Sequence, residues 1–121
     1  MKVPTQHPQE IEVWYILPAI RRELVLTLKE KGKAQKDIAA LLNITEAAVS
    51  QYTNEKRGTG VTFPVEVKEF IAKAAAEITD PATAYFQIQR ISEYIKHSKV
   101  ICKLHAQIEG DLKGCDVCYK K

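Results

Sequence analysis

The chain has 121 residues, of which 45% are hydrophobic, and its formal net charge is +3. This length suits one domain, or a small domain with an appendage, and the apolar fraction is sufficient for a buried core. No apolar run is long enough to cross a bilayer, and residues 1–10 lack the apolar core of a signal peptide, so we expect a cytoplasmic protein. The mild positive charge permits contact with nucleic acid without indicating it.

The N-terminal part is expected to lead into one long helix. Residues 1–9 contain two prolines and few apolar side chains, which predicts a loose arm. The segment 10–17 reads as helical or extended and packs over the core, with Trp14 as a core or interface anchor. Pro18 is suited to the first position of a helix that runs to about Lys31.

Residues 35–57 contain two short amphipathic patterns separated by three residues. Each pattern places apolar side chains at i, i+1 and i+4, first at Ile38, Ala39 and Leu42 and then at Ala48, Val49 and Tyr52. Two helices on so short a turn must cross steeply and bury a common wedge, which is the helix-turn-helix geometry. Asn43 tolerates the left-handed conformation that ends the first helix, and Thr45 can cap the second.

The outward face of the second helix is short and polar, as expected of a helix that enters a major groove. The best candidates for hydrogen bonds to base edges are Ser50, Gln51 and Asn54. Glu46 and Ala47 lie near the start of that helix, where Ala47 could meet a thymine methyl group. Candidates for contact with the phosphate backbone are Gln35, Lys36, Thr45, Lys56 and Arg57. For Lys36 an ordinary solvated charge is an equally good interpretation, and Glu46 and Glu55 would repel phosphate.

The second half of the chain predicts two further helices. Pro64 can open one that runs to Ile78, and the pair Asp80-Pro81 can open another that runs to about His97. An apolar stripe on the last helix comprises Ala84, Ile88, Ile91 and Ile95. We favour core packing over a dimer interface for most of this stripe. The predicted fold is therefore an all-α bundle of about five helices.

The last segment contains all three cysteines, Cys102, Cys115 and Cys118, together with His105. Three interpretations remain open on the residues alone. The three thiolates could hold an iron–sulfur cluster, which would leave one iron open to His105, to another ligand or to a small molecule. With His105 they could instead form a tetrahedral Cys₃His zinc site, which the spacing permits at least equally well. In the third, no metal binds and Cys115 and Cys118 form a reversible disulfide. Outside a metal site, His105 is expected to be a solvent-exposed histidine on a short helix.

The run from Leu17 to Gly58 resembles predicted transcriptional regulators of archaea and anaerobic bacteria, which carry an XRE-like helix-turn-helix and a C-terminal cysteine motif. The matching elements are LPAIR, QKDIA and AAVSQY, and the run covers about a third of the chain. Ala34 stands where a capping serine is usual, and Asn43 where glycine is common. The resemblance implies a regulator of double-stranded DNA with a three-cysteine cluster, most simply 4Fe–4S, which favours a cluster over zinc.

These features divide the chain into three parts. Residues 1–60 form the helix-turn-helix unit with its arm, 61–97 a helical packing or dimerisation region, and 98–121 the cysteine segment. We expect the regulator to be a homodimer, because a single copy should bind DNA only modestly. The three-cysteine cluster would sense redox state or the supply of iron and sulfur. The alternatives are a regulator with a structural zinc site and a protein-binding adaptor module. No substrate motif accompanies the cysteines, so we do not expect an enzyme.

Overall fold

A computed structural model of the chain describes residues 6–98 and 100–108. All the regular secondary structure in this part of the chain is helical, with no strand, which confirms the predicted all-α class. The elements in chain order are α1 (Pro8–Ile11), the π-helical turn η1 (Glu12–Ile16), α2 (Leu17–Glu30), α3 (Gln35–Leu42), α4 (Glu46–Thr53), α5 (Val65–Ala76), α6 (Pro81–His97) and α7 (Val100–Ile108).

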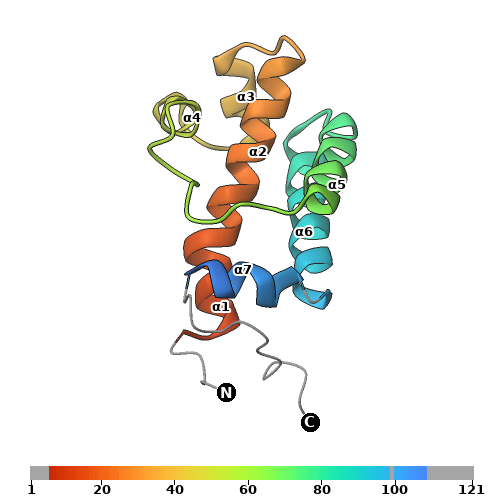
Figure 1. The fold of residues 1–121 in the computed structure, drawn as a ribbon. Coiled ribbons are helices and arrows are strands. Elements are labelled where there is room, and N and C mark those ends of the chain that lie inside the picture. The colour runs from red at the N-terminus through yellow and green to blue at the C-terminus, as the bar shows by residue number, and fades with distance from the viewer. Residues whose placement is uncertain (1–5, 99, 109–121) are drawn as a thin grey trace, which may run out of the picture.

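The long helix α2 runs through the middle of the molecule (Figure 1). The short pair α3 and α4 packs toward one end of α2, and α5 and α6 pack along its other side. The linker from α4 to α5 passes across α2, and α7 crosses near its N-terminal end (Figure 1). The helix α7 is additional to the five helices of the predicted bundle, although a short helix around His105 was expected for the chain without a metal.

The N-terminal arm is more helical than the sequence predicted. Helical structure begins at Pro8 and continues through η1 into α2, so Pro18 lies inside a continuous helical run and does not start a helix. Proline lacks an N–H group and its ring crowds the preceding turn. The run accommodates Pro18 with a wider turn just before it, in which the Leu17 N–H donates to the Glu12 carbonyl five residues back.

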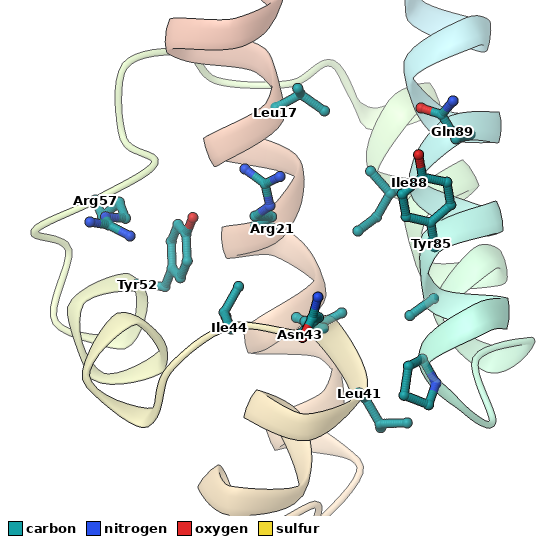
Figure 2. A pocket seen from close by; sticks show the side chains of 13 residues that line it. Leu17, Arg21, Leu41, Asn43, Ile44, Tyr52, Arg57, Tyr85, Ile88 and Gln89 are labelled. Carbon is teal, nitrogen blue, oxygen red and sulfur yellow. The ribbon is translucent and has the colours of Figure 1, made fainter.

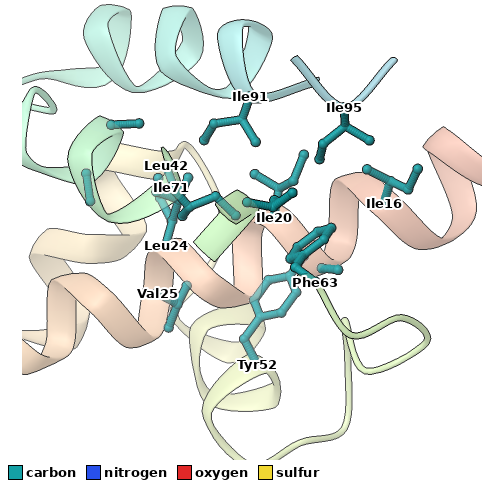
Figure 3. Packing of buried hydrophobic residues seen from close by; sticks show 14 of the residues in the cluster. Ile16, Ile20, Leu24, Val25, Leu42, Tyr52, Phe63, Ile71, Ile91 and Ile95 are labelled. Carbon is teal, nitrogen blue, oxygen red and sulfur yellow. The ribbon is translucent and has the colours of Figure 1, made fainter. Parts of the chain in front are cut away.

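One hydrophobic core joins all the helices (Figure 3). The most completely buried side chains include Ile16, Ile20, Leu24, Val25, Ile71, Ile91 and Ile95. The preference for core packing of the α6 stripe is thus confirmed, since Ala84, Ile91 and Ile95 are buried and Ile88 is partly buried. The prediction for Trp14 was wrong as regards the core, because its side chain is 60% exposed.

The connection between α5 and α6 is fixed by the N-cap that the sequence predicted. The Thr83 N–H donates to the Asp80 carboxylate at 2.7 Å, and the Asp80 N–H donates back to the Thr83 hydroxyl at 3.0 Å. The hydrogen bond from the Thr83 backbone is the main reason that the pKa of the Asp80 carboxyl lies below its ordinary value of 3.8. The cap starts α6 at Pro81.

The helix α7 is anchored at two points. Leu104 is fully buried in the core, and His105 is 4% exposed, so the expectation of a solvent-exposed histidine was wrong. The Gln107 side chain bonds to both backbone polar groups of Thr62 in the linker, at 2.7 and 2.8 Å.

None of the helices in the described ranges is both long and apolar enough to cross a membrane.

Candidate nucleic-acid interface

The turn between α3 and α4 has the local chemistry that the sequence predicted. Asn43 adopts a left-handed conformation with φ 55° and ψ 46°, which ends α3. Thr45 is the N-cap of α4, and its hydroxyl accepts a hydrogen bond from the Ala48 N–H at 3.0 Å. Ala34 supplies no such side-chain bond at the start of α3. The angle between α3 and α4 is therefore held by the turn and by the buried apolar side chains that the two helices share.

The outward face of α4 is solvent-exposed along its length. Glu46, Ala47, Gln51 and Asn54 are exposed, and Ser50 is half-buried. Asn54 is the C-cap of α4, and its amide nitrogen lies 3.3 Å from the Ser50 hydroxyl. The candidate base-reading residues thus form one polar strip, in which Ser50 and Asn54 orient each other.

The Gln35 side chain makes a hydrogen bond that the sequence did not predict. Its side-chain amide donates to the Glu46 carbonyl at 3.0 Å, which joins the first residue of α3 to the first residue of α4. The N-termini of both helices therefore lie side by side. Helix N-termini carry unpaired N–H groups and a partial positive charge, so this edge suits a phosphate oxygen.

The charges around α4 are mixed. Lys36, Lys56 and Arg57 are all exposed and therefore accessible to a phosphate backbone. The Arg57 guanidinium lies 5.7 Å from the centre of the Tyr52 ring, which restrains it beside α4. Glu55 is paired with Arg22 of α2 at 3.5 Å, so its negative charge is partly offset.

The sequence prediction missed the residues that hold the end of α4 against α2. Glu55 has a φ of 59°, and Gly58 has a φ of 76°. A Cβ atom on Gly58 would lie 2.6 Å from the Pro18 carbonyl oxygen and 2.9 Å from the Arg22 Cβ, so only glycine allows this approach. The contact of Gly58 with Pro18 and the Arg22–Glu55 ion pair fix the end of α4 against α2. They also fix the position of Lys56 and Arg57, which lie between Glu55 and Gly58 in the chain.

The cysteine segment is described only in its first part. Cys102 is half-buried on α7, and the buried His105 follows one turn later. Residues one turn apart on a helix can reach one centre, and thiolate and imidazole are suitable ligands for zinc. Cys115 and Cys118 lie outside the described residues, within which no group of three metal-ligating side chains occurs.

Comparison with known proteins gives no relative: the chain matches no protein-family model, no curated protein and no solved structure.

Proposed function

We propose that the chain is a sequence-specific DNA-binding regulator that acts as a homodimer. The observation that carries this proposal is the exposed polar face of α4, held at the end of a capped three-residue turn against α3. Gln51 and Asn54 have the donor and acceptor pair that matches an adenine edge, and Ser50 can bond to several bases. The adjoining N-termini of α3 and α4 would take the phosphate on one side of the groove.

A dimer is part of the proposal for an energetic reason. The described surface around α4 offers few cations, namely Lys36, Lys56 and Arg57, and it also carries Glu46. Affinity for DNA depends mainly on the number of phosphates that are neutralised, so one copy would bind weakly. Two copies would double these contacts and read two half-sites about 34 Å apart on one face of the duplex.

The regulatory part of the proposal concerns the cysteine segment. Cys102, Cys115 and Cys118 would hold an iron–sulfur cluster that reports redox or iron–sulfur state, and zinc with His105 as a fourth ligand is the alternative. Either centre would be attached to α7, which is bonded to the linker through Gln107 and Thr62. That linker continues directly from α4, so a change at the centre has a short route to the DNA-reading helix.

The proposal is tested by selecting binding sites from random duplex DNA with protein purified without oxygen. We expect enrichment of a sequence with two related half-sites, and an affinity that falls steeply as salt rises. Binding by full-length protein should then be compared with that of a variant that carries Gln51→Ala and Asn54→Ala together. Failure to enrich any sequence, or equal preference in wild type and variant, would count against DNA reading by α4 and favour a protein-binding adaptor.

A further inference from the structure

A pocket of about 470 Å³ lies between α2, the α3–α4 turn and α6. Figure 2 shows Tyr52 and Arg57 on one side of it, Tyr85 and Gln89 on the other, and Arg21 of α2 between them. Its volume lies within the range of about 300–1,000 Å³ that is typical of small-molecule sites. The pocket is formed on the side of α4 that faces the body of the molecule, because Tyr52 belongs to the core.

The lining of the pocket is cationic without a compensating acid. Arg21 and Arg57 both line it, and none of its lining residues is an aspartate or a glutamate. Arg21 is half-buried, and within residues 6–98 and 100–108 it takes part in no ion pair. The neighbouring Arg22, by contrast, is paired with Glu23 and Glu55. A partly desolvated guanidinium without an anion is costly, so Arg21 is prepared for an anion from outside the chain.

The remaining walls supply an apolar surface and further donors. Leu17, Leu41, Ile44 and Ile88 line the pocket with hydrocarbon. In Figure 2 the Tyr52 hydroxyl lies between the guanidinium groups of Arg57 and Arg21. Within the described chain this hydroxyl makes no hydrogen bond, so it can donate one to a ligand. Tyr85 lies on the opposite wall and is 73% exposed, so its ring is free to cover a bound molecule.

We propose that this pocket binds a small organic anion, with its oxyacid head held by Arg21, Arg57 and the Tyr52 hydroxyl that stands between them in Figure 2, and with a short apolar body against α6. Guanidinium groups form two parallel hydrogen bonds with a carboxylate or a phosphate, so both heads fit the chemistry. The site does not depend on DNA binding, since its walls come from α2 and α6 as well as from the turn. Its ligand would, however, hold Arg57 and the α3–α4 turn, which gives it a direct influence on α4.

The test is a nuclear magnetic resonance titration of the full-length ¹⁵N-labelled protein. Two anions with the same phenyl body, benzoate and phenyl phosphate, are compared with their neutral counterparts benzamide and phenol. We expect saturable shifts of the amides of Arg21, Ile44 and Ile88 with at least one anion, and binding of its neutral counterpart about tenfold weaker or more. The stronger of the two anions identifies the head group as a carboxylate or a phosphate.

Variants locate the site. Arg21→Gln and Arg57→Gln should each weaken anion binding about tenfold. Lys29→Gln removes one positive charge from the exposed end of the same helix α2 and should leave binding unchanged. Three results would overturn the proposal. The first is no saturable shift at anion concentrations up to about 10 mM, which exceeds the Kd expected of a minimal fragment. The second is equal binding of the neutral counterparts, and the third is shifts of these amides that follow protein concentration alone, which would make the pocket a contact between two copies.

Discussion

The side-chain amide of Gln107 bonds to both the N–H and the carbonyl of Thr62, at 2.7 and 2.8 Å, although the two residues are 45 positions apart. A glutamine amide can replace a neighbouring backbone strand in this way because it presents one donor and one acceptor. The pair ties α7, which carries Cys102, to the linker that follows α4. It therefore connects α7 to the linker that leads away from α4, the proposed DNA-reading helix.

Replacing Gln107 with alanine should therefore loosen α7. Both bonds are exposed to solvent, so we expect the free energy of unfolding to fall by only about 1 kcal/mol. Amide hydrogen exchange should become faster in α7 and at residues 61–64, and should stay unchanged in α3. Gln107→Glu is the matched control, since it keeps the acceptor for the Thr62 N–H and loses the donor. Equal exchange in all three proteins would show that the buried side chains of α7, and not the Gln107 bonds, hold it in place.

Gly58→Ala should lower the stability of the whole domain. The added Cβ would meet the Pro18 carbonyl oxygen at 2.6 Å, and the φ of 76° is already unfavourable for alanine. We expect a loss of about 2 kcal/mol or more in urea unfolding. Gly32→Ala is the control, because Gly32 also has a positive φ, of 87°, but nothing lies within 4 Å of its added Cβ. It should lose only about 1 kcal/mol, and equal losses would refute the close contact at Pro18.

The helix-turn-helix region was predictable because its signals are local. The i, i+1, i+4 spacing of apolar residues, Asn43 in the turn and Thr45 at the cap all act within a few residues, and the structure has each of them. The helix α7 carries the same spacing at Val100, Ile101 and Leu104, which are all buried. The helix α7 was therefore predictable from the same local spacing.

The exposure of Trp14 could not be predicted from a period of 3.6 residues. In a regular α-helix, the residues that share the face of Ile11 would be Trp14 and Tyr15. The π-helical turn inserts one residue before Pro18, so Ile16 takes the inward position and Trp14 is turned to solvent. The Arg21 pocket was also beyond sequence reasoning, because its lining comes from segments that meet only in the folded chain.

The Asp80 cap predicts a specific dependence of stability on pH. The pKa of the Asp80 carboxyl is lowered in the folded protein. The cap therefore contributes its full stability at pH values above 3.8, the ordinary pKa of the group. This contribution is lost as the pH falls through the lower pKa of the folded state. Asp80→Ala should therefore lower the Tm at pH 7, and the difference from wild type should shrink below pH 3.8. Asp80→Asn is the control, because its side chain can still accept the Thr83 bond but does not titrate. A difference in Tm between wild type and Asp80→Ala that is constant with pH would contradict the linkage.

On DNA, Gln51 and Lys56 should have different effects if the proposed function is right. Gln51→Ala should lose about 1–3 kcal/mol of discrimination at one base position of the selected sequence. Lys56→Ala should weaken binding to all sequences and reduce the salt dependence by about one ion. Gln9→Ala, an exposed glutamine on α1, is the matched control and should change neither quantity. Unchanged footprints in the Gln51 and Lys56 variants would remove both residues from the interface.

The nature of the cysteine centre is decided by spectra and metal analysis of protein purified without oxygen. A cluster would give a broad absorption band near about 400 nm with iron and sulfide, whereas a zinc site would be colourless. Cys102→Ser, Cys115→Ser and Cys118→Ser should each lose the metal. His105 separates the two centres, because His105→Asn should release zinc but leave a cluster with three thiolate ligands in place. Since His105 is buried, its variant must first be shown to keep the helical circular dichroism of the wild type. Retention of full metal content in any cysteine variant would remove that cysteine from the proposed ligands.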